Sequence, residues 1–150
     1  MGFLAQLLRV VARVLTGSTY VMLGYDALRA PGGRVGVAAP TLARLRSVVP
    51  VPVPADDELV VRANAAAQVA AGAALALGKA PRLSALVLAG SLVPTTAAGH
   101  AFWTHEDPAT RKQQQVQFHK NMAMIGGLLF AVLDRPRSGR RRTPDADVTG

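Results

Sequence analysis

Four long apolar blocks dominate this chain and restrict its fold more than any other feature. The last block, residues 116–133, stops abruptly at Asp134, Arg135 and Pro136. About 20 helical residues cross the hydrocarbon core of a bilayer, and only helices and closed barrels satisfy every backbone polar group there. The blocks therefore predict an all-α integral membrane protein, an antiparallel four-helix bundle with spans near residues 5–28, 59–78, 83–103 and 116–133.

The segments between the blocks predict how the spans are connected. Residues 30–58 form a long first loop, in which residues 39–49 have the pattern of a short helix that would lie in the membrane interface or cap the bundle. The turn at residues 79–82 is short, so the second and third spans are expected to be antiparallel neighbours. Residues 136–150 carry almost no apolar side chains and are expected to form a disordered basic tail.

The second block is unusually rich in alanine, and it places Gly72 and Ala76 four residues apart. Small residues at this spacing allow the backbones of two membrane helices to approach closely. This helix is therefore predicted to lie inside the bundle, with Gly72 at a close helix contact. Val132, in the fourth block, is expected to face lipid instead.

The basic residues predict the orientation of the bundle in the membrane. Lys and Arg are enriched in cytoplasmic segments, above all next to the ends of spans. A cluster of arginines directly follows the fourth span, at residues 135–142. We therefore expect both termini to be cytoplasmic, the first loop to be extracytoplasmic, and the protein to lie in the plasma membrane.

This orientation collects polar residues at the two ends of the bundle. Ionisable residues at membrane depth are costly and often functional, so both sets are candidate sites. The alternative is that the long side chains reach the membrane interface, with Asp26 paired to Arg29 or Arg62. The predicted outer pocket comprises Asp26, Arg29, Arg62, Asn64, His100, His119, Lys120 and Asn121, and the predicted inner charged set comprises Arg9, Arg13 and Asp134.

Several kinds of chemistry are excluded or not expected. The chain has no cysteine, which excludes disulfides, thiolate metal sites and cysteine nucleophiles. His100, His105 and His119 lack close ligand spacing, so we expect no metal site, and we do not expect His100 and His119 to ligate haem. The net charge of +8 does not by itself predict nucleic-acid binding, because aromatic residues are few.

The order and spacing of four motifs resemble those of the DoxX family of small four-helix membrane proteins, and of its actinobacterial branch in particular. Many relatives have lysine where this chain has Asp26, so a role of that position in relatives does not transfer directly. The motifs are G-Y-D-A-L-R at residues 24–29, R-A-N-A-A-A-Q at 62–68, P-T-T-A-A-G-H-A-F-W at 94–103 and Q-F-H-K-N-M-A-M-I-G-G-L-L at 117–129.

This resemblance implies a redox association. It suggests a subunit of a membrane redox complex, linked to quinone-coupled oxidation of sulfur compounds or thiols and to defence against oxidative stress. It equally suggests a scaffold that recruits superoxide-detoxifying and sulfur-transfer enzymes. Passage of a small molecule or ion is a third alternative. A quinone suits the outer donors better than haem does, because His and Lys can donate hydrogen bonds to its carbonyl oxygens.

Overall fold

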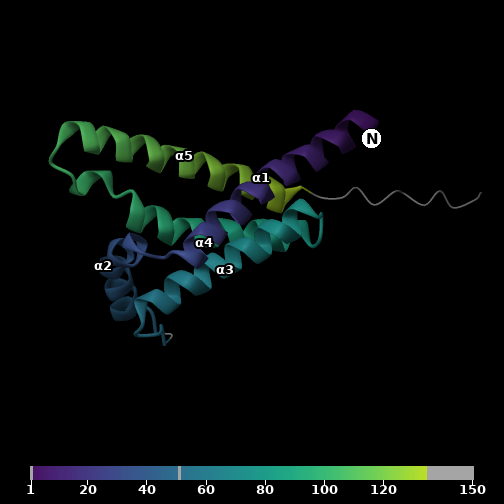
Figure 1. Ribbon diagram of the computed structural model, residues 1–150. Coiled ribbons are helices and arrows are strands. Elements are labelled where there is room, and N and C mark those ends of the chain that lie inside the picture. The colour runs from purple at the N-terminus through teal and green to yellow at the C-terminus, as the bar shows by residue number, and fades with distance from the viewer. Residues whose placement is uncertain (1, 51, 135–150) are drawn as a thin grey trace, which may run out of the picture.

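The computed structural model describes residues 2–50 and 52–134, and this part of the chain is helical without strands. The predicted tail at residues 136–150 lies outside the described residues. The elements, shown in Figure 1, are α1 (Phe3–Arg29), α2 (Gly33–Val48), α3 (Asp57–Ala76), α4 (Pro81–Gly99), the 3₁₀ helix η1 (Phe102–Thr104) and α5 (Pro108–Leu133).

Four helical segments are long and apolar enough to cross a membrane, which confirms the predicted all-α membrane bundle. They are Phe3–Arg29, Asp57–Ala76, Pro81–Thr104 and Pro108–Leu133. The N-terminal half of α1, the α3–α4 turn and the C-terminus of α5 lie at one end of the bundle (Figure 1). We call this the inner end, and the end that carries α2 and η1 the outer end.

Local sequence signals explain where these helices begin. Asp56 caps α3, because its Oδ1 accepts hydrogen bonds from the backbone N–H groups of Glu58 (2.9 Å) and Leu59 (3.2 Å). Asp107 caps α5 in the same way, with Oδ2 2.7 Å from the Thr110 nitrogen and a proline as the first helical residue. The last membrane helix thus starts well before residue 116, where its apolar stretch begins.

The closest helix contact joins α1 to α3 through glycine. A methyl group added at Gly72 would lie 2.8 Å from the Gly17 carbonyl oxygen, and one added at Gly24 would lie 2.9 Å from the Ala65 carbonyl oxygen. Both distances are shorter than carbon and oxygen tolerate, so only glycine fits at either position. The predicted close packing of Gly72 is confirmed, and its partner is α1.

Small residues and a few large ones share the buried core, while many other large apolar side chains lie on the surface of the bundle. The buried core contains small residues, among them Ala85 and Ala89, around the larger Tyr20, Leu88 and Leu128. Many large apolar side chains point outward instead, including that of Phe130, which is 78% exposed. In lipid this arrangement is favourable, because acyl chains solvate Leu and Phe while small residues allow close backbone contact.

Two local expectations need correction. The helix of the first loop begins at Gly33 rather than at residue 39, and it continues through Pro40. Its Leu42 is buried, and Arg46 holds its C-terminal end to the start of α3 through an ion pair with Asp57 (2.7 Å). Val132 does not simply face lipid, because it is partly buried against the core.

Candidate functional site

The outer polar residues are distributed over separate helix interfaces. Between α3 and α4, the Ser91 hydroxyl donates to Asn64 Oδ1 (2.7 Å) and accepts from Gln68 Nε2 (2.8 Å). Ser91 is buried, so this network satisfies polar groups at the contact between the two helices. Asn64 therefore has a structural partner in α4, which leaves its side chain less available to a ligand.

Two further polar contacts hold α4 to α5. Asn121 Nδ2 donates to the hydroxyl of buried Thr96 (3.0 Å), and the Thr96 hydroxyl donates in turn to the Leu92 carbonyl (2.6 Å). At the end of α4, His100 Nδ1 and Gln114 Oε1 form a hydrogen bond of 2.8 Å. Because Thr96 and His100 are four residues apart, both contacts lie on the same interface between the two helices.

The charged residues at the outer end do not form the expected ion pairs of Asp26 with Arg29 or Arg62. Arg62 forms an ion pair with Glu58 (2.9 Å) and donates from Nη1 to the Leu28 carbonyl (2.6 Å). Arg29 lies over the ring of Tyr25, 5.5 Å from its centroid. Asp26 is exposed and has no ion pair within the described residues. The expected pairs of Asp26 with Arg29 or Arg62 are therefore absent there.

His119 and Lys120 lie on the exposed surface of α5. His119 Nδ1 is 2.8 Å from the Gln115 carbonyl oxygen. A carbonyl can only accept, so Nδ1 carries the proton and Nε2 is the nitrogen that can take one up. Phe118, next to His119, packs edge-on against Phe102 and Trp103 and so anchors η1 on α5.

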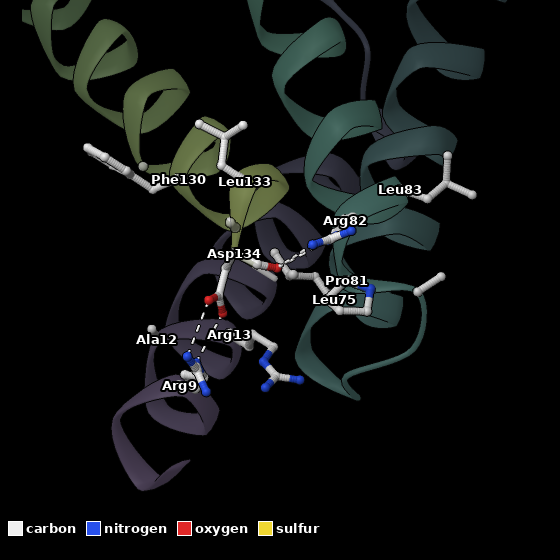
Figure 2. A pocket seen from close by; sticks show the side chains of 13 residues that line it. Arg9, Ala12, Arg13, Leu75, Pro81, Arg82, Leu83, Phe130, Leu133 and Asp134 are labelled. Carbon is white, nitrogen blue, oxygen red and sulfur yellow. Dashed lines mark hydrogen bonds and ion pairs between the residues drawn. The ribbon is translucent and has the colours of Figure 1, made fainter. Parts of the chain in front are cut away.

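The inner charged set is joined in a single cluster (Figure 2). Arg9 forms a two-pronged ion pair with the carboxylate of Asp134, with Nε–Oδ2 and Nη2–Oδ1 distances of 3.0 and 3.2 Å. Arg82, from the start of α4, donates from Nε and Nη2 to the Asp134 carbonyl oxygen (3.1 and 3.0 Å). Asp134 therefore ties α1, α4 and α5 together.

Arg82 was not included in the predicted inner charged set. The sequence did contain a signal for Arg82. This residue follows the first residue of α4, which begins after a short turn at the same end of the bundle as Arg9. Arg13 completes the cluster: its Nη1 would lie 2.9 Å from a side-chain carbon at Gly78, whose φ is +69°. Glycine at position 78 thus permits both the turn and the position of the Arg13 guanidinium.

These arginines line an open groove of about 960 Å³ at the inner end, which we call the inner groove. The charged side chains along it are Arg9, Arg13, Arg82 and Asp134, and the rest of the lining is largely apolar, as Figure 2 shows for Leu83 and Phe130. Three positive charges against one negative charge leave the groove basic.

A second cavity, of about 300 Å³, lies between α1 and α5. Thr16 and Tyr20 line it from α1, and Met124 and Leu128 line it from α5. The Tyr20 hydroxyl is buried and has no hydrogen-bond partner within the described residues. Sequence reasoning missed this residue, although a tyrosine in the middle of an apolar span is a polar group that needs a partner.

Within residues 2–50 and 52–134, no three His, Asp or Glu side chains gather closely enough to hold a metal ion. Candidate sites in this part of the chain include the inner groove, the cavity beside Tyr20 and the exposed outer donors.

Comparison with known proteins gives one result. The sequence matches the DoxX family over residues 8–104, which cover most of α1 and all of α2, α3, α4 and η1. It matches no curated protein and no solved structure. The match spans more than half of the chain and agrees with the four membrane helices and with the motifs in α1, α3 and α4. This multi-pass membrane protein belongs to the DoxX family.

Proposed function

We propose that this protein is a subunit of a redox complex in the plasma membrane, with both termini cytoplasmic, and that it binds a quinone between α1 and α5. Membership of the DoxX family supports the redox association. The observation that carries the proposal is the buried Tyr20 hydroxyl, which has no partner in the described part of the chain and belongs to a residue that lines the α1–α5 cavity.

The residues around this cavity fit a quinone ring. Its volume of about 300 Å³ lies at the lower end of the range for ligand sites, and its walls include apolar Leu15, Met124 and Leu128. A quinone carbonyl accepts hydrogen bonds, and a tyrosine hydroxyl can donate one. Because the Tyr20 hydroxyl has no partner to give up, donating to a ligand would break no existing hydrogen bond.

Protein atoms cover the Tyr20 hydroxyl, so binding requires this side chain to shift toward the cavity. Gly127 lines the cavity from α5 and has no side chain that would obstruct such a shift. The hydroxyl would then hold one carbonyl of the ring, and the apolar walls would exclude water from it.

A bound quinone would supply the capacity to carry electrons and protons through the lipid phase. The chain's own contribution at the outer end would be proton exchange. His119 is exposed, and its Nδ1 is engaged by the Gln115 carbonyl, so Nε2 is the ring nitrogen that can accept a proton. Lys120 beside it would favour an anionic reductant by its charge. Superoxide-detoxifying and sulfur-transfer enzymes remain the partners that the family suggests.

Substitution of Tyr20 by Phe tests the proposal, because it removes one oxygen and keeps the ring in the core. Equilibrium binding of short-chain benzoquinones and naphthoquinones to the protein in lipid nanodiscs should weaken about five- to tenfold, the value of one ordinary hydrogen bond. Tyr25→Phe is the matched control, since Tyr25 is the other tyrosine of the chain and is exposed at the outer end.

The same variant also predicts a change in stability. A buried hydroxyl without a partner costs about 1–3 kcal/mol, so Tyr20→Phe without ligand should be at least as stable as the parent protein. Equal quinone affinity in Tyr20→Phe and Tyr25→Phe, or no quinone binding by the parent, would refute the site. If the quinone site were refuted but soluble redox enzymes still co-purified with the protein, a role as a scaffold would replace the proposed role as a quinone-binding subunit.

A further inference from the structure

The inner groove offers a second site that is independent of the cavity beside Tyr20. The groove is basic, whereas that cavity is largely apolar. It is rimmed by arginines and walled by exposed apolar side chains. We propose that it binds an anionic phospholipid of the leaflet in which α1 begins, with the lipid phosphate held by Arg13, Arg9 and Arg82.

The charge of the groove requires an anion. Asp134 is the one acidic side chain that lines it, against three guanidinium groups. Asp134 engages Arg9 through its carboxylate and Arg82 only through its backbone carbonyl, which carries no net charge. Arg13 has no carboxylate partner among the described residues. Among the lining residues that the structure describes, the positive charges thus outnumber the negative ones by two.

The geometry of the cluster favours a phosphate over a halide or a metal-bound water. Guanidinium groups present pairs of N–H donors that match the oxygens of a phosphate. Two of the three groups are already oriented, since Arg9 and Arg82 are both fixed on Asp134. The glycine at position 78 leaves the space that the Arg13 guanidinium occupies. The donors are thus largely positioned before a ligand arrives, which lowers the entropy cost of binding.

The walls of the groove identify the anion as a lipid. Leu83, Phe130 and Leu133 line it and are 63%, 78% and 72% exposed. Side chains of this kind in a membrane protein contact acyl chains. The groove also lies where α3 turns into α4 and where α5 ends, so its charged rim is at the membrane boundary. A phospholipid matches both the basic rim, through its phosphate, and the apolar walls, through its acyl chains. A free anion matches only the rim.

Thermal unfolding in a non-ionic detergent tests the proposal, with Trp103 fluorescence as the signal. Phosphatidylglycerol should raise the unfolding midpoint more than phosphatidylcholine, and glycerol phosphate should not raise it. Arg13→Gln should require about tenfold more phosphatidylglycerol for the same rise, because a charge-assisted hydrogen bond is lost. Arg111→Gln, an exposed arginine near the start of α5, is the control and should behave as the parent protein.

The outcomes separate the sources of the phosphate. Stabilisation by glycerol phosphate equal to that by phosphatidylglycerol would overturn the lipid in favour of a soluble anion. Equal effects of the two lipids with no loss in Arg13→Gln would overturn the site itself. If Arg13→Gln does not fold, Arg82→Gln serves instead. It removes another guanidinium group that lines the groove and should likewise require more phosphatidylglycerol for the same rise. An unchanged requirement would refute the charge argument.

Discussion

The contact between Gly72 and α1 gives the sharpest test of the packing. In Gly72→Ala the new methyl carbon would lie 2.8 Å from the Gly17 carbonyl oxygen and 3.1 Å from both Tyr20 Cβ and the Val21 nitrogen. Two of these three atoms belong to the backbone of α1, which cannot rotate away as the end of a side chain can. The helices must therefore separate by roughly 0.5 Å for the methyl group to fit in a close-packed interior.

Two effects of opposite sign set the size of the change. Overpacking a close contact costs about 1–3 kcal/mol, whereas replacing a helical glycine by alanine returns about 0.5–1 kcal/mol. Gly72→Ala should therefore lower the free energy of unfolding by about 1–2 kcal/mol. Gly17→Ala should be worse, because its methyl group would meet the Gly72 carbonyl oxygen and lie 2.8 Å from the Ala76 nitrogen.

Gly126→Ala is the matched control, since Gly126 also lies within a membrane helix and a methyl group added there would meet no neighbouring side chain or helix within 4 Å. It should be neutral or stabilise by about 0.5–1 kcal/mol. Reversible unfolding in mixed micelles of an anionic and a non-ionic detergent measures all three variants. If Gly72→Ala were as stable as Gly126→Ala, the close approach of α1 and α3 would be refuted.

Three further predictions concern topology, pH and chemistry. Cysteines introduced at Gly36 and at Lys79 should react on opposite sides of the membrane with an impermeant thiol reagent, and labelling of both from outside would refute the orientation. Hydrogen bonds from the Thr110 side chain and backbone lower the pKa of Asp107. The cap of α5 should therefore stabilise the protein fully above about pH 4, and this stabilisation should be lost as the pH falls further. Asp107→Asn should make the unfolding midpoint less dependent on pH in this range. In cells without the native copy, His119→Ala should lower tolerance to oxidative stress at normal expression, and unchanged tolerance after replacing His100 as well would exclude a chemical role for the outer donors.

Sequence alone determined the class of fold, an all-α membrane bundle with four long apolar helices. A bilayer leaves so few ways to satisfy the backbone that long apolar blocks become helices almost irrespective of their detailed composition. Local signals add the ends, as Asp56 and Asp107 do by capping their own helices within three residues. The small residues around Gly72 likewise predicted a close contact between two helices. Side-chain size is read directly from the sequence, and it limits how closely two backbones can approach.

Only the tertiary structure decided which helix faces meet. Lipid solvates apolar residues on every side, so the spans lack the polar stripe that would reveal their orientation in a soluble bundle. The partner of Gly72 in α1, the bond from Arg62 to the Leu28 carbonyl and the exposed position of Asp26 therefore could not be derived from spacing. Arg9 and Arg82 meet at Asp134 because three helices converge there. Tyr20 has no hydrogen-bond partner in the described part of the chain because helix packing placed it in the apolar core.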